Sequence, residues 1–173
     1  MEAPTDTQII DRLRYADGDA VRMSGDIGLG NWTLMTSMAL AFYALKSDDP
    51  EATASDNMDR VSMIVSHFGG RAGEWRSGEA DGNTSSVYAD RDVWINLFMQ
   101  SQDYLNSVVE GYFSTYGAGH EAEAIAEIGN HINVSVAASC MRFSDPQAAL
   151  QRCKENVERT ITFVREQCSF VEE

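Results

Sequence analysis

The residues best suited to metal or acid–base chemistry lie on one predicted helix, at about 120–141. His120, Glu123, Glu127 and His131 are spaced by three, four and four residues, which places them on one face of that helix. Imidazole and carboxylate groups are the ligands of zinc and di-iron sites in helical bundles. The isoleucines Ile125, Ile128 and Ile132 lie on the opposite face and should meet the core, so we expect the His/Glu face to be polar and solvated.

The histidines also support a second hypothesis, a metal-dependent helical-bundle enzyme. Its ligands would be His67, His120, Glu127 and His131, with one coordination position left open for substrate. The Glu-x-x-His step of ferritin-like sites is missing, because Glu127 and His131 are four residues apart. We therefore expect no cofactor and no catalytic residue, and the enzyme remains the alternative.

Cysteine and glycine spacings point to structural roles. Cys140, Cys153 and Cys168 lack the spacing of zinc ligands. Two of them fall on the apolar face of the last predicted helix, where cysteine behaves as a small hydrophobic residue, so we expect buried free thiols. The glycines at 25, 28 and 30 follow no strand and precede no lysine at phosphate-loop spacing. They indicate a flexible linker.

Charge restricts the classes of partner. The chain carries 27 acidic and 13 basic residues, a net charge of −14. Such a charge opposes binding to nucleic-acid phosphates and to anionic membranes. No segment approaches the roughly 18 apolar residues of a membrane span, and the N-terminus lacks the basic and apolar regions of a signal peptide. We expect a cytoplasmic protein with a basic protein partner.

The predicted helices at about 90–116 and 120–141 could form an anionic hairpin. No Lys or Arg occurs between Arg91 and Arg142. The acidic residues of this span are the candidate partner-binding residues: Asp92, Asp103, Glu110, Glu121, Glu123 and Glu127. Unneutralised carboxylates would attract a basic partner through their long-range field. The alternative is that acidity covers the whole surface and serves solubility or growth at high salt.

A Gly-, Ser- and charge-rich loop is predicted at about 70–87, and we expect it to be flexible. Trp75 beside Arg76 has the composition of a binding hot spot if the indole is exposed. The alternative is a tryptophan that folds back over the edge of the bundle.

Apolar residues recur at helical spacing through most of the chain. Helices are predicted at about 6–15, 31–45, 55–68, 90–116, 120–141 and from 144 to the end, with a linker at 16–30. The helix at 31–45 is apolar on nearly all sides and should be central. The sequence therefore predicts an all-α, single-domain bundle of five or six helices over residues 1–173.

Three functions are compatible with these features. The first is a small, acidic, non-catalytic interaction protein that binds, and inhibits or regulates, a basic nucleic-acid-handling protein, as phage or mobile-element proteins do. The second is the metal-dependent enzyme. The third is a homo-oligomeric structural or assembly subunit that buries the aromatic face of the helix between Trp94 and Tyr116.

Overall fold

The computed structural model describes residues 4–80, 82–83 and 87–172, with side chains as far as Gln167. In this part of the chain there are six α-helices, one 3-10 helix and no β-strand. They are α1 (Asp6–Ile27), α2 (Leu29–Leu45), α3 (Pro50–Phe68), η1 (Gly69–Glu74), α4 (Arg91–Tyr116), α5 (Glu121–Cys140) and α6 (Pro146–Glu172). The predicted all-α class is confirmed. No described helix is long and apolar enough to span a membrane.

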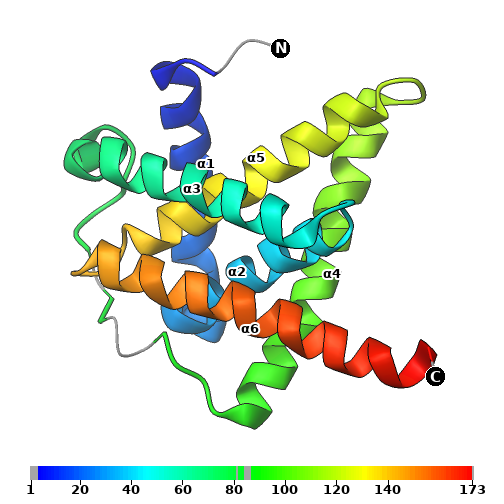
Figure 1. Ribbon diagram of the computed structural model, residues 1–173. Helices are drawn as coiled ribbons and strands as arrows, with labels where there is room; N and C mark the ends of the chain where they lie inside the picture. Colours follow the sequence, from blue (N-terminus) through cyan, green and yellow to red (C-terminus); the bar gives the residue numbers. More distant parts are fainter. Residues whose placement is uncertain (1–3, 81, 84–86, 173) are drawn as a thin grey trace.

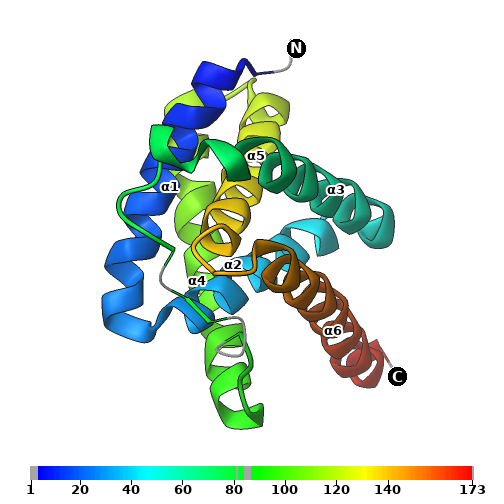
Figure 2. The ribbon, with the colours of Figure 1, turned by 90° about the vertical axis from the view of Figure 1, so that its left-hand side faces the viewer.

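Two helices, α2 and α5, occupy the middle of the molecule and are surrounded by the other four (Figure 1). Each of the two contacts all the other α-helices. By contrast, α1 packs closely on α2 and α5 but not on α3 or α4. The view at 90° shows α1 on the opposite side of α5 from α6 (Figure 2). Spaces therefore remain on both sides of α1, and α5 lies beneath both of them.

The central position of α2 follows from its composition. Apolar side chains occur all around it, so it has no polar face to present to solvent. Its buried hydroxyls are satisfied locally, since Thr36 donates to the Thr33 carbonyl at 3.0 Å and Ser37 to that of Leu34 at 2.8 Å. The predicted central helix is confirmed, although it begins two residues earlier, at Leu29.

The predicted linker at 16–30 is wrong for most of its length. α1 continues through Gly18 and Gly25 and ends only at Gly28, whose φ of 93° is left-handed. Each helical glycine costs about 1 kcal/mol relative to alanine. Burial of Ala16, Asp17 and Ala20 against the neighbouring helices offsets that cost.

The aromatic face of α4 packs inside the chain. Trp94 stacks on Phe98 with ring centroids 5.6 Å apart, and both contact Phe163 of α6 edge-to-face. Phe98 also meets Phe42 of α2 at 5.0 Å. The residues that we considered for a homo-oligomer interface thus form much of the contact between α4 and the rest of the bundle.

A buried ion pair attaches the segment after η1 to the bundle. The Arg142 guanidinium lies 2.5 Å from an Asp17 carboxylate oxygen, and these side chains are 4% and 2% exposed. The other Asp17 oxygen accepts hydrogen bonds from the backbone N–H and the hydroxyl of Ser77. Arg142 also donates to the carbonyls of Ser77 and Glu79. The first part of the predicted loop is therefore η1 and a segment hydrogen-bonded to the bundle; residues 81 and 84–86 lie outside the described residues.

Cys140 and Cys153 are buried free thiols, as predicted, with their Sγ atoms 3.6 Å apart. Their hydrogen bond and burial raise the pKa of the Cys140 thiol. The Cys168 side chain lies outside the described part of the chain.

Candidate interaction surface and the spaces beside α1

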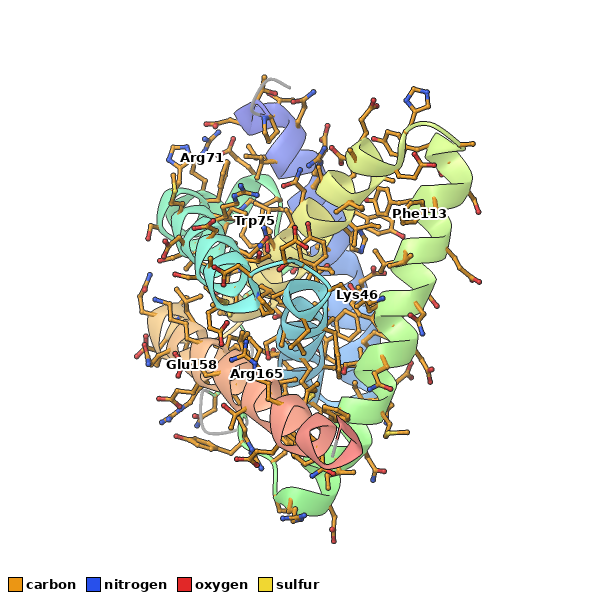
Figure 3. The ribbon with its side chains drawn as sticks, turned by 45° about the vertical axis from the view of Figure 1, so that its right-hand side comes forward. Lys46, Arg71, Trp75, Phe113, Glu158 and Arg165 are labelled. Carbon is orange, nitrogen blue, oxygen red and sulfur yellow. The ribbon has the colours of Figure 1, made fainter. Side chains whose placement is uncertain are left out.

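Most of the predicted acidic residues of the hairpin lie at the surface. The side chains of Asp92, Asp103 and Glu110 on α4, and of Glu121 and Glu123 on α5, are exposed. Figure 3 shows α4 along one edge of the molecule, with side chains extending into solvent. The α4 carboxylates make no ion pair within the described residues. Those of α5 bond locally: Glu121 accepts from the Gly119 N–H at 3.1 Å, and Glu123 lies 3.2 Å from a His120 ring nitrogen.

The α4 acidic residues form a straight stripe with one methionine. Asp92, Met99, Asp103 and Glu110 are separated by seven, four and seven residues, so their directions differ by no more than about 40° around the helix axis. The stripe is about 27 Å long at the rise of an α-helix. Met99 is 58% exposed, so its side chain is accessible to a partner. The acidic stripe, defined by these four residues, therefore combines charge with an accessible apolar contact.

Glu127 does not belong to the free acidic surface. Its carboxylate lies 3.1 Å from the Arg12 guanidinium of α1, and its side chain is only 17% exposed. The expectation of a wholly solvated His/Glu face is wrong here, because α1 and α4 cover this part of α5. Ile125, which we placed in the core, is instead 47% exposed.

The candidate metal ligands make separate contacts. The His67 ring nitrogen lies 3.0 Å from an Asp6 carboxylate oxygen, His120 contacts Glu123, and His131 contacts the Tyr112 hydroxyl at 3.2 Å. Glu127 pairs with Arg12. Within the residues that the structure describes, no three His, Cys, Asp or Glu side chains gather as a ligand set. The second hypothesis thus gains no geometric support.

Trp75 is buried and not an exposed anchor. The indole is 3% exposed, and its N–H donates to the Phe68 carbonyl at 3.2 Å (Figure 3). Arg76 donates to the Met141 carbonyl at 2.8 Å. Both side chains thus attach the end of η1 to α3 and to the end of α5. The alternative prediction, a tryptophan that folds back over the bundle, is confirmed.

A groove of about 630 Å³ lies between α1 and α4, above α5. Its polar wall includes Tyr15, Asp19, Tyr104, Tyr112 and His131. The Tyr104 hydroxyl lies 3.3 Å from the Ser135 hydroxyl, and Tyr112 is hydrogen-bonded to His131. Sequence reasoning missed this groove because its residues come from three helices and share no motif.

Burial shifts the titration of the polar side chains in the groove. Burial raises the pKa of Tyr104 to about 12 and also raises the pKa of Tyr112. Burial lowers the pKa of His131, and the nearby Asp19 opposes that shift only in part. At neutral pH, protonated phenols then face a neutral imidazole. This arrangement suits hydrogen bonding to a ligand.

A second space, of about 580 Å³, lies on the other side of α1, against α3 and α5. It shares Arg12 and Val134 with the groove, so the Arg12–Glu127 pair stands between the two.

No protein-family model, no curated protein and no solved structure is significantly similar to this chain.

Proposed function

We propose that this protein is a non-catalytic, acidic interaction protein that binds a basic segment of a partner protein along the acidic stripe of α4. The observation that carries the proposal is the alignment of Asp92, Asp103 and Glu110 with Met99 on one exposed line. A helical partner segment with basic residues at matching spacing would pair with the carboxylates and cover the methionine. Such helix-on-helix recognition uses the same spacing rules as intramolecular packing.

The net charge of the protein supports rapid association. A charge of −14 produces an attractive field for a basic partner beyond the range of direct contacts. The basic proteins that handle nucleic acids are the partner class that we favour, with inhibition or regulation as the consequence of binding. The cytoplasm is the expected compartment, a phage or other mobile element the expected source, and direct nucleic-acid binding is not expected.

The stripe is too sparse to imitate a DNA duplex by itself. Duplex DNA carries about one negative charge per 1.7 Å of its axis. The stripe has three carboxylates over about 27 Å. The proposal therefore favours recognition of a basic helix, in which a few charges and one apolar contact set the register.

The test uses a synthetic helical peptide in which four positions have the 7-4-7 spacing of the stripe. The position opposite Met99 is Leu and the other three are Lys. A second peptide has the same composition with scrambled spacing. Binding is measured by fluorescence anisotropy at low and high salt. Replacement of Asp92→Asn, Asp103→Asn and Glu110→Gln together should weaken binding of the matched peptide by about tenfold or more, since each charge-assisted contact contributes more than a neutral one. The scrambled peptide should bind more weakly than the matched one.

The control variant removes three other exposed acidic residues, Asp48→Asn, Asp56→Asn and Glu158→Gln, and changes the net charge equally. Asp48 lies just before α3, Asp56 lies on α3 and Glu158 lies on α6. Glu158 is away from α4 (Figure 3). Asp49 and Glu51 are unsuitable because Asp49 caps α3 and Glu51 pairs with Arg165. Equal losses in both variants would mean that only total charge matters, and failure of the matched peptide to bind would refute the proposal.

A further inference from the structure

The space between α1, α3 and α5 has the size of a small-molecule site. Its volume of about 580 Å³ lies within the usual range of about 300–1,000 Å³ for such sites. Each helix contributes residues at helical spacing, and much of the lining is apolar: Ile9 from α1, Ile64 and Phe68 from α3, and Val134 from α5. We refer to this space as the α1/α3/α5 cavity.

Basic side chains line this cavity, although the protein as a whole is strongly acidic. Among the described residues of the lining, Arg12, Arg60 and His67 are basic and Asp6 is the only acidic one. Asp6 is already engaged by His67 at 3.0 Å and by Arg71 at 2.9 Å, and these hydrogen bonds lower its pKa. Arg12 is paired with Glu127, whereas Arg60 makes no ion pair within the described part of the chain. The charge available to a ligand in the cavity is therefore positive.

A buried amide in the lining has an unused acceptor. Asn133 is 2% exposed and donates from Nδ2 to Oδ1 of Asn57 at 2.8 Å. Asn57 uses its own Nδ2 on the Thr53 carbonyl at 2.7 Å, which determines the orientation of both amides. Oδ1 of Asn133 is then left without a donor among the described residues. A buried acceptor without a partner is costly, so a donor supplied by a ligand would be favoured.

We propose that the α1/α3/α5 cavity binds a small apolar carboxylic acid that carries an amide N–H or a hydroxyl. The carboxylate pairs with the Arg60 guanidinium, and the apolar chain lies against Ile64, Phe68 and Val134. The N–H or O–H donates to Oδ1 of Asn133. N-acyl amino acids have a carboxylate, an apolar chain and an amide N–H. The cavity offers a partner for each of them: a cation, an apolar wall and a buried acceptor. This site is independent of the acidic stripe on α4.

The experiment measures binding of N-octanoylglycine to the full chain by isothermal titration calorimetry. Its methyl ester lacks the charge, octanoic acid lacks the amide N–H, and octylamine reverses the charge. The ester and the amine should bind at least about tenfold more weakly than N-octanoylglycine, because a hydrogen bond to a charged group contributes more than a neutral one. Octanoic acid should fall between N-octanoylglycine and the ester.

Arg60→Met should weaken binding of N-octanoylglycine by about tenfold, and it should fold normally because Arg60 is exposed. Arg22→Met is the matched control, since Arg22 is an exposed arginine outside both spaces, and it should leave affinity within about twofold. Ligand-induced NMR shifts should concentrate at Asn133 and at the Ile9 and Ile64 methyls, which line the α1/α3/α5 cavity but not the groove beside α4. Equal binding of acid and ester, no effect of Arg60→Met, shifts confined to the groove beside α4, or no binding of the acid at millimolar concentration would each overturn the proposal.

Discussion

Asp17 and Arg142 form an ion pair in the interior, whereas Asp92, Asp103 and Glu110 stand on the surface and make no ion pair in the described structure. Further hydrogen bonds hold the buried pair in place: the Ser77 N–H donates to Asp17, and Arg142 donates to the carbonyls of Ser77 and Glu79. The surface carboxylates are hydrated and can be moved or removed at little cost. The comparison distinguishes a charged pair that stabilises the fold from carboxylates that remain accessible to a partner.

The largest effect should come from breaking the buried pair. Arg142→Met leaves the Asp17 carboxylate buried, with Ser77 as its only donor among the described residues, and we expect a loss of about 3–5 kcal/mol in the free energy of unfolding. Urea denaturation measures it. The double variant Asp17→Asn/Arg142→Met should lose less, because no charge remains buried.

Arg14→Met provides the exposed comparison. Arg14 pairs with Asp11 at the surface and also donates to the Glu74 carbonyl at 2.6 Å. Both side chains of the pair are more than half exposed, so its loss should cost no more than about 1 kcal/mol. If Arg142→Met cost no more than Arg14→Met, the buried pair would not hold the segment after η1, and the contrast between the two regions would fail.

The buried pair also marks the limit of what the sequence can predict. Asp17 and Arg142 are 125 residues apart, and no local pattern connects them. The sequence around Asp17 predicts a linker, because of Gly18 and Gly25, at a place where α1 in fact continues. Local helix propensity was outweighed by packing of Ala16 and Ala20 on α2 and α5, which only the folded structure reveals.

Helices with a clean 3.6-residue pattern were predictable. The expected helix at 90–116 matches α4 within one residue, and its acidic residues Asp92, Asp103 and Glu110 are exposed. The exposure of the α5 side chains was harder to predict, because the sequence of one helix does not show which neighbouring helices cover each of its sides. Glu127 and His131 have a polar pattern, yet α1 and α4 lie over them. The two spaces beside α1 depend on the same three-helix arrangement and left no signal in the sequence.

The next effect concerns His131, a half-buried group that should titrate with folding. Its pKa is lowered in the folded state, mainly by burial. The unfolded chain therefore binds a proton more readily, and the His131 contribution to stability is present above the ordinary histidine pKa of about 6.5 and is lost as pH falls below it.

We expect the free energy of unfolding of the wild type to decrease relative to that of His131→Asn between pH 7.5 and pH 5, as measured by urea denaturation. Carboxylate titrations occur in both proteins and cancel in the difference. A difference that stays constant across this range would show that His131 is as accessible to protons as an exposed histidine. His131 would then belong to the surface of α5 and not to its interior.

The smallest effect should come from the stripe itself. Neutralising Asp103→Asn and Glu110→Gln should change the free energy of unfolding by less than about 0.5 kcal/mol each, because neither carboxylate has a fixed partner in the described structure. Removing negative charge from a chain of net charge −14 also reduces self-repulsion, so the sign should be slightly stabilising at low salt. Added salt screens this repulsion beyond about 8–10 Å, and the gain should disappear by 0.5 M NaCl.

Thermal unfolding at both salt concentrations measures this change in stability, with the pair Asp48→Asn and Glu158→Gln as the charge-matched control. A clear destabilisation confined to the stripe variants would mean that these carboxylates support α4 directly, and they would then belong with Asp17 and Arg142 rather than with a surface kept free for a partner.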